Sequence, residues 1–204
     1  HFTTYAEMVA SALGKPPKKS LDVGSNDGLF LSILKDRYST DILGIDPAQN
    51  ACNYANSLGV NTINDFFGID TAEAIKNEYG TFDHISANNV YAHNDDLQSF
   101  TKAISNILES GGVFSFEISY LIDIVNKSLV GTIFHEHLSH HSLLPLFHFL
   151  EIYDLHLFDA IKVDTQGGAL ICFASKTIKR EKTISLKSLV EIEESLNVTS
   201  HAYM

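Results

Sequence analysis

The segment 134–141, FHEHLSHH, places four histidines and one glutamate within eight consecutive residues. An imidazole titrates near neutral pH, so it can act as a general base, bind a metal ion or exchange hydrogen bonds with its neighbours. Three kinds of site therefore compete for this segment: a catalytic base, a metal site and a structural histidine cluster. The other polar residues of the chain provide the evidence for choosing between these three kinds of site.

The spacing of these histidines does not match the zinc-protease motif HExxH, because Ser139 occupies the position four residues after His135. His135 and His137 share one face of an extended segment, and they could bind a metal ion together with His140 or Glu136. A catalytic role needs only one or two of the imidazoles. The metal site and the structural cluster stay open as alternatives to a catalytic base.

A second chemical signal is the turn DVGSNDG at 22–28. Gly24 removes a Cβ at the end of a predicted strand, Asn26 tolerates a left-handed backbone, and Gly28 lets the following helix pack closely. The turn is neither GxGxxG nor a P-loop, which would end in GK[ST]. Ordinary turns have the same composition, but this one suits a ligand that approaches the backbone, and we include Asp22 among the cofactor-binding candidates.

Acidic and aromatic residues follow the next two predicted strands. Asp46 lies roughly 20 residues beyond the turn, where a carboxylate can accept hydrogen bonds from both hydroxyls of a ribose. The same aspartate could instead cap the following helix. Asp65 and Phe66 could hold an adenine by a hydrogen bond and a ring contact, although we expect one of Phe66 and Phe67 to be core.

Polar residues also end the fourth and fifth predicted strands. We expect Asn88 to face the crevice at the carboxyl ends of the strands, where a cofactor or a substrate binds. Glu117 points toward the same crevice, and a buried carboxylate there needs a task or a partner. Asp95 and Asp96 begin a helix, so we interpret them as favourable charges at its positive end.

Strand-like and helix-like segments alternate over the first 120 residues. The predicted strands lie within 19–28 and at 41–46, 60–65, 82–90 and 112–119. The predicted helices lie at 29–38, 47–59, 71–80 and 95–112. Such alternation with short loops implies right-handed βαβ crossovers and a parallel sheet.

Beyond residue 120 this rhythm changes. A helix is predicted over 142–154, followed by a hairpin of 155–164 and 167–176 around TQGG, and then a charged helix over 177–197. We therefore predict an α/β fold: a Rossmann-like class I methyltransferase with a mostly parallel seven-stranded sheet that ends in an antiparallel hairpin. A nicotinamide-binding domain would instead continue into a second parallel half.

The composition of the chain excludes some classes of binding partner. The chain has 204 residues and a net charge of −11, which argues against nucleic acid because phosphate binding needs a clustered basic face. No apolar run reaches the ~20 residues of a membrane span, and the N-terminus has no signal-peptide pattern. Cys52 and Cys172 form no CxxC pair. We expect a cytoplasmic protein that binds neither nucleic acid nor membrane.

Taken together, the motifs DVGSNDG, GIDPA, ANNVYAHNDDL, SFEISYLID, FHEHLSHHSL and GGAL resemble the sugar C-methyltransferases of deoxysugar biosynthesis over about residues 5–180. These enzymes use S-adenosylmethionine to methylate a carbon of a nucleotide-linked 4-keto-6-deoxyhexose. The resemblance implies S-adenosylmethionine as cofactor, S-adenosylhomocysteine as product and a nucleotide-sugar substrate. It places zinc only in an N-terminal domain that is absent from this chain.

The resemblance also implies a further C-terminal domain that is absent here. We predict a methyltransferase domain at 1–180 and a connecting helix at 181–204 that leads toward that domain. The oligomeric state is open.

The resemblance assigns roles to three residues. The histidine matching His137 is the favoured base, with Glu136 placed to assist or orient it, and His93 matches a candidate partner of the sugar carbonyl. Elementary chemistry agrees, because removing a proton next to a ketone needs a base whose pKa lies near neutrality.

The same reaction needs hydrogen-bond donors at the enolate oxygen. Family members often have a tyrosine where this chain has Phe134. Either the donor comes from His93, Tyr91 or Tyr120, or the substrate preference differs from that of the family.

Three other functions remain possible. An O-methyltransferase would use His137 to deprotonate a hydroxyl group. A non-catalytic module would bind S-adenosylmethionine for a partner domain. A nicotinamide-dependent sugar enzyme is disfavoured by the single βαβ set and the terminal hairpin.

Overall fold

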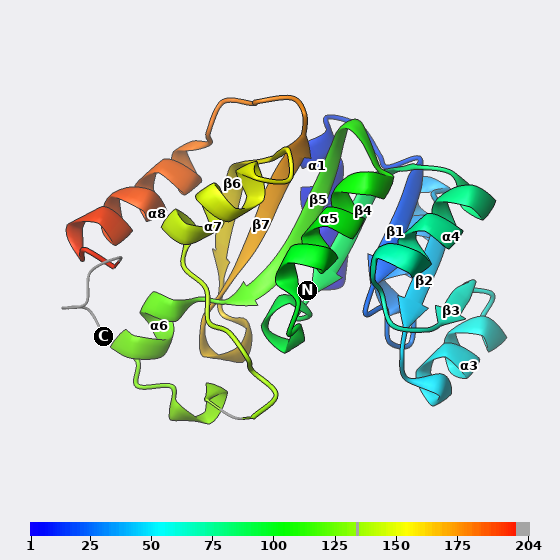
Figure 1. Cartoon of the computed structure of the whole chain (residues 1–204), viewed down its shortest axis with the longest axis horizontal. Coiled ribbons are helices and arrows are strands. Elements are labelled where there is room, and N and C mark those ends of the chain that lie inside the picture. The colour runs from blue at the N-terminus through cyan, green and yellow to red at the C-terminus, as the bar shows by residue number, and fades with distance from the viewer. Residues whose placement is uncertain (134, 199–204) are drawn as a thin grey trace.

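A computed structural model, which describes residues 1–133 and 135–198, contains one seven-stranded sheet in the order β3-β2-β1-β4-β5-β7-β6 (Figure 1). The strands are β1 (Lys19–Val23), β2 (Asp41–Asp46), β3 (Thr62–Asn64), β4 (Phe82–Asn88), β5 (Leu108–Ser119), β6 (Leu155–Val163) and β7 (Ala169–Lys176). The first five strands pair in parallel, and β7 runs antiparallel between β5 and β6. This topology confirms the predicted fold class.

Eight α-helices and three short 3₁₀ turns are described. The helices are α1 (Phe2–Leu13), α2 (Leu29–Tyr38), α3 (Gln49–Ser57), α4 (Ile69–Tyr79), α5 (Leu97–Ile107), α6 (Leu121–Asn126), α7 (Leu143–Glu151) and α8 (Ile184–Ser195). The 3₁₀ turns are η1 (Tyr91–His93), η2 (Val130–Thr132) and η3 (Thr165–Gly167). None of the helices in the described ranges is long and apolar enough to cross a membrane.

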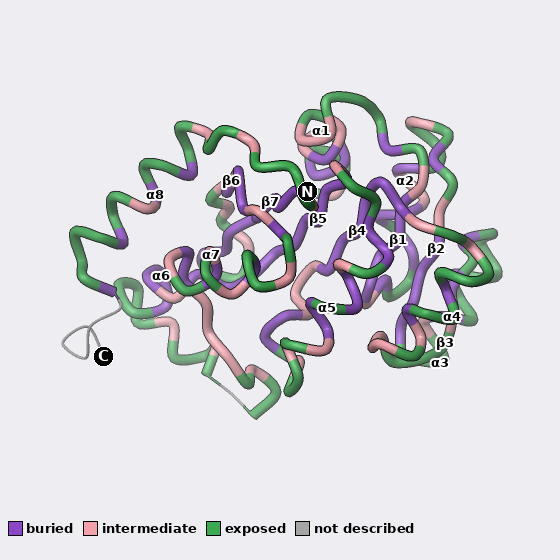
Figure 2. Tube along the Cα trace, turned by 45° about the horizontal axis from the view of Figure 1, so that its top comes forward, coloured by how far each residue is buried: buried purple, intermediate pink, exposed green. Residues whose placement is uncertain are grey.

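Helices cover both faces of the sheet. On one face α1 packs on α2 through Tyr5 and Phe30, and both helices contact Phe173 of β7. On the other face α4, α5, α7 and α8 enclose the larger core. Strands buried on both faces consist mainly of apolar residues, which is why the sequence predicts them well; Figure 2 shows the central strands as the most buried part of the chain.

Several elements differ from the prediction, among them the short helix α6, which was not predicted. The N-terminal helix α1 was not predicted, although Tyr5 and Val9 form its buried stripe. The helix predicted over 95–112 ends at Ile107, because residue 108 already pairs with β4. The charged helix predicted over 177–197 begins at Ile184, where the Thr183 hydroxyl accepts the N–H of residue 186 at 3.2 Å.

The last helix is attached to the domain rather than standing apart from it. Leu186 and Leu189 belong to the main core, and the Glu193 carboxylate accepts the backbone N–H groups of Leu143 and Leu144 at 2.7 and 2.9 Å. These contacts join α8 to the start of α7. The predicted boundary at residue 180, and the further domain beyond the chain, stay predictions.

The topology gathers the chemical residues at one edge. The carboxyl ends of β1 to β5 meet there, and the β6–β7 turn reaches the same edge because β7 runs in the opposite direction (Figure 1). This is the edge at which open α/β sheets bind ligands.

Candidate active site

The glycine-rich turn after β1 is tied to β2 by Asp46. The carboxylate of Asp46 accepts the N–H of Asn26 at 2.9 Å and the N–H of Ala48 at 2.8 Å, and Asn26 has a left-handed φ of 49°. The second bond is to the N-cap residue of α3 itself, and no side chain of the described residues caps this helix, so the capping role considered for Asp46 is not observed. A carboxylate has about four lone-pair sites. Two accepted bonds therefore leave acceptor capacity for a ribose.

Two glycines of this turn cannot be replaced without movement. A Cβ on Gly24 would lie 2.6 Å from a methyl group of Val90, and a Cβ on Gly28 would lie 2.8 Å from one of Val60. Both glycines also have a positive φ, of 72° and 75°. The turn thus approaches the segment after β4 and the segment before β3 more closely than a side chain would allow, which keeps its backbone at the crevice.

Asp22 lies beneath the turn and is almost completely buried. It accepts a hydrogen bond from the Ser86 hydroxyl at 2.6 Å. Burial, with a smaller contribution from the nearby charge of Asp46, raises the pKa of Asp22 to about 7. A carboxyl group that titrates near neutrality thus lies at the end of β1.

A pocket of about 170 Å³ opens between the turn, Asp65, Phe66 and Val90. Phe66 is 76% exposed, while Phe67 packs edge-on against Phe100 at 5.3 Å between ring centroids. One of the two phenylalanines is therefore core, as expected, and the other is available to a ligand. The Asp65 carboxylate accepts the N–H of Phe66 at 2.8 Å.

The ends of β4 and β5 supply Asn88 and Glu117 side by side in register. The buried Oδ1 of Asn88 accepts no hydrogen bond from the described residues. Glu117 has a relative exposure of 2%, and burial raises its pKa. It has two partners, the Thr165 hydroxyl and the His1 ring at 3.0 Å, so the partner expected for a buried carboxylate exists.

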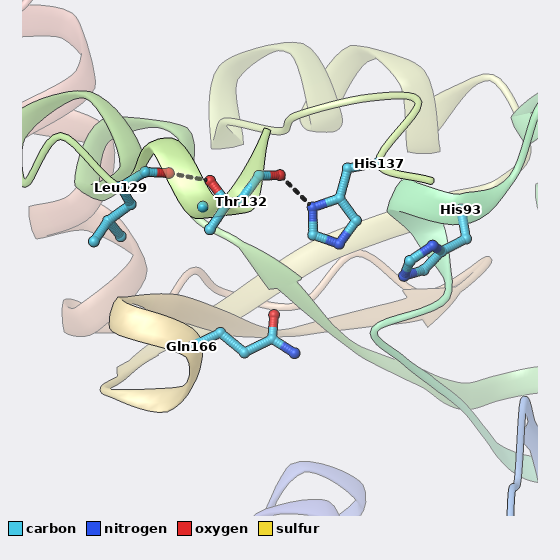
Figure 3. Close-up of a pocket in the computed structure, with 6 residues that line it drawn as sticks. His93, Leu129, Thr132, His137 and Gln166 are labelled. Carbon is cyan, nitrogen blue, oxygen red and sulfur yellow. Dashed lines mark hydrogen bonds between the residues drawn. The ribbon is translucent and has the colours of Figure 1, made fainter. Parts of the chain in front are cut away.

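His137 lies in a second, larger pocket of about 470 Å³ together with His93 and Gln166 (Figure 3). Its Nδ1 is 2.7 Å from the backbone carbonyl of Thr132. A carbonyl only accepts, so Nδ1 must carry the hydrogen, and the lone pair of the neutral ring is then on Nε2. The ring centroids of His93 and His137 are 4.9 Å apart. The structure thus brings the two predicted catalytic histidines together.

Glu136 lies elsewhere. Its side chain is 63% exposed and its carboxylate is 3.7 Å from His135 Nε2. The orienting contact at Nδ1 of His137 comes from Thr132 instead, a backbone group that no sequence motif reveals. The assisting role of Glu136 stays a prediction.

The remaining histidines of the segment differ from His137. His140 lies 6.0 Å from it, centroid to centroid. His141 contacts Ser139 at 3.0 Å, and burial lowers the pKa of His141 to about 4, which suits a structural role. Across residues 1–133 and 135–198, no three His, Cys, Asp or Glu side chains are grouped to hold a metal ion.

The three residues expected to donate a hydrogen bond to an enolate oxygen lie in different surroundings. Tyr91 and Tyr120 are buried, and the Tyr91 hydroxyl is bonded to Thr101 at 2.8 Å, so both rings belong to the core. His93 lines both the smaller and the larger pocket. Position 134 lies outside the described residues. Gln166 also lines the larger pocket, although its sequence context predicted only a hairpin turn.

Comparison with known proteins agrees with this arrangement. A family model for a methyltransferase domain matches residues 2–159. The C-methyltransferase NovU of Streptomyces niveus is 31% identical over 155 residues, which cover 76% of this chain and 37% of NovU. The chain therefore spans well under half the length of that relative.

Solved structures share the fold at low identity. The plantazolicin methyltransferase BpumL, in complex with a pentazolic desmethylPZN analog and SAH, has a TM-score of 0.66 and 14% identity, over 88% of this chain and 83% of that one. The magnesium protoporphyrin IX methyltransferase of Synechocystis PCC 6803 has a TM-score of 0.65 and 12% identity, over 85% and 83%. With its sheet order and the match over residues 2–159, the chain belongs to the methyltransferase-domain family.

Proposed function

We propose that this chain is the catalytic domain of a sugar C-methyltransferase. It transfers a methyl group from S-adenosylmethionine to the carbon next to the ketone of a nucleotide-linked 4-keto-deoxysugar. Membership of the methyltransferase-domain family supports the methyl transfer, and the similarity to NovU, a C-methyltransferase by name, supports transfer to carbon.

We assign the cofactor to the smaller pocket together with the glycine-rich turn and the strand ends beside it. Asp46 has acceptor capacity left for the ribose hydroxyls, and the exposed ring of Phe66 beside Asp65 offers a surface for the adenine. The buried Asn88 Oδ1, which accepts no bond within the described ranges, suits the ammonium group of the methionine portion. Gly24, Asn26 and Gly28 keep the backbone close enough for contact. When bound, S-adenosylmethionine supplies a methyl group activated by its positively charged sulfur.

The base step belongs to His137. Its Nε2 lone pair takes the proton from the carbon next to the ketone, the C–H electron pair forms a C=C bond, and the carbonyl π pair moves to oxygen. The resulting carbon nucleophile forms the new C–C bond as the S–CH₃ bond breaks, with its electron pair going to sulfur. The ketone is restored and the imidazolium releases its proton to water. General-base catalysis of this kind contributes about 10²–10⁴-fold.

One observation carries the proposal. The Thr132 carbonyl fixes the tautomer of His137 inside a pocket whose wall, at His93, also lines the cofactor pocket. A base oriented in this way, next to the place where a methyl donor fits, suits proton removal followed by methyl transfer. A hydroxyl acceptor would need the same base, so the test must distinguish carbon from oxygen.

The experiment follows the full protein with S-adenosylmethionine and thymidine-diphospho-4-keto-6-deoxyglucose in deuterated water, by mass spectrometry and NMR. We expect exchange of the hydrogen next to the ketone and a new carbon-bound methyl group. His137→Asn should lower both by about 10²–10⁴-fold. The matched control His135→Asn changes an exposed histidine in the same segment and should leave both unchanged. A methyl group on oxygen would support the O-methyltransferase alternative.

A further inference from the structure

An enolate oxygen accepts more than one hydrogen bond, and of the donors expected from the sequence His93 alone lines the larger pocket. The carboxyl ends of the strands are rich in carboxylates, including Asp22, Asp46 and Glu117, which only accept when ionised. Tyr91 and Tyr120 belong to the core. Apart from the two histidines, Gln166 is the pocket-lining side chain within the described residues that carries several N–H groups.

The orientation of the Gln166 amide follows from its neighbour. The Ser119 hydroxyl, at the end of β5, donates to Gln166 Oε1 at 3.4 Å. The oxygen side of the amide is therefore turned toward Ser119, and the two N–H groups of Nε2 are left for another acceptor. In Figure 3, Gln166 reaches from the hairpin turn into the space that His137 and His93 face.

The backbone around Gln166 is held in a demanding conformation. Residues 166, 167 and 168 have successive φ values of 51°, 88° and 151°. A Cβ on Gly167 would lie 2.9 Å from Leu129, and one on Gly168 would lie 2.2 Å from the carboxylate of Asp123. A non-glycine residue with a left-handed backbone persists only where its surroundings determine it, and such residues are concentrated at functional sites.

An ion network around the buried Asp123 holds the turn in place. The Asp123 carboxylate, 3% exposed, accepts Lys162 Nζ at 2.6 Å and Lys127 Nζ at 3.1 Å. Lys127 Nζ also donates to the Gly167 carbonyl at 2.7 Å. The turn that carries Gln166 is thereby locked to α6 and β6, so the side chain enters the pocket from a rigid support.

We propose that Gln166 is a catalytic residue whose Nε2 donates a hydrogen bond to the sugar carbonyl oxygen and stabilises the enolate. The inference rests on the proposed function. Gln166 transfers no proton: it stays neutral while His137 takes the proton and the carbonyl π pair moves to oxygen. When the new C–C bond forms, that pair returns to the C=O bond.

The test compares Gln166→Met, which keeps the size of the side chain but has no donor, with Gln166→Glu, which places an acceptor there. The full protein is given thymidine-diphospho-4-keto-6-deoxyglucose in deuterated water, with and without S-adenosylmethionine. Hydrogen exchange next to the ketone, kcat, KM and the Kd of S-adenosylhomocysteine are measured. The control Asp164→Asn alters an exposed side chain of the same turn that makes no cap hydrogen bond.

We expect Gln166→Met to lower exchange and kcat together by about 10²–10³-fold, as removal of one oxyanion donor does. Gln166→Glu should lose at least as much, and the cofactor Kd should stay within about twofold in both variants. Ser119→Ala leaves the turn intact but removes the orienting hydroxyl, so about a tenfold loss in kcat is expected even if a substitution at 166 prevents folding.

Exchange and kcat of Gln166→Met within about threefold of the wild type, or a rise in KM alone, would overturn the assignment. In both cases the wild-type reaction is intact, so only the role of Gln166 fails. Absence of exchange and of C-methylation in the wild type itself would instead overturn the proposed function, and the inference with it.

Discussion

A histidine works as a general base only if one ring nitrogen holds a lone pair that faces the substrate. Here the backbone carbonyl of Thr132 imposes that state on His137. The residue types in FHEHLSHH do not predict this contact. The sequence pointed to His137 and His93 as candidates because their residue types are visible in it, and the structure places the two rings 4.9 Å apart, centroid to centroid. The sequence could not identify Gln166, since the role of a glutamine in a TQGG turn depends on which wall of a pocket the folded turn faces.

Asp22 leads to a prediction about stability. A carboxyl group whose pKa is raised to about 7 by burial holds its proton more tightly in the folded chain than in the unfolded one. Folding therefore becomes less favourable as the pH rises from about 4 to 7, and stays so above it. Asp22→Asn removes this titration and still offers an acceptor to Ser86.

Urea unfolding should show Asp22→Asn to be more stable than the wild type at pH 8, by up to about 4 kcal/mol, with little difference at pH 4. The exposed Asp36→Asn serves as the control. An equal difference at both pH values would contradict a raised pKa at this site.

At the scale of elements, the strands were predicted better than the helices that pack on them. Buried parallel strands show as apolar runs, and Asp46 and Asn88 end the runs at which they were expected. The helix α1 was missed, because its buried stripe is short and the helix is stabilised by packing on Phe30 rather than by the propensity of its own residues. The premature end of α5 is likewise set by pairing of residue 108 with β4.

The inner strands share a buried polar chain that has a measurable acid sensitivity. His84 of β4 is bonded to Ser20 of β1 at 2.7 Å and to Ser115 of β5 at 2.8 Å, and Ser115 is bonded to Tyr5 of α1 at 2.6 Å. Burial lowers the pKa of His84 to about 3. The unfolded chain binds this proton more readily, so stability is lost as the pH falls from about 6.5 toward 3.

His84→Asn should destabilise the protein at pH 7.5, because it disturbs this chain of hydrogen bonds. The difference from the wild type should shrink by about 2 kcal/mol at pH 5, since only the wild type pays for keeping the imidazole neutral. Chemical unfolding at the two pH values measures it. A difference that does not change with pH would mean that His84 is protonated in the folded protein at pH 5.

At the scale of the whole molecule, the segment with His137, the proposed base, is held between two anchored parts. Before it, Asp123 of α6 accepts a hydrogen bond from Lys162 of β6, and Lys127 at the end of α6 donates to the Gly167 carbonyl of the hairpin turn. After it, α7 is fixed by Glu193 of α8, whose fully buried carboxylate accepts the first two N–H groups of that helix. The last helix therefore supports the pocket from a distance.

Glu193→Gln should lower the free energy of unfolding by about 1.5–3 kcal/mol, the range for hydrogen bonds to a charged group. The adjacent exposed Glu194→Gln should stay within about 0.5 kcal/mol of the wild type. Thermal and urea unfolding measure both variants. Equal stability of the two variants would show that the contact between α8 and α7 contributes little.

The order of residues along the chain divides the molecule into two parts. Most residues proposed to bind the methyl donor come from the segment 22–88. The residues proposed to surround the sugar, apart from His93, come from the segment 117–168. Substitutions can therefore accumulate in the two segments independently during evolution. A lineage can acquire a new acceptor by substitutions in the later loops alone, while the earlier half continues to recognise the same methyl donor.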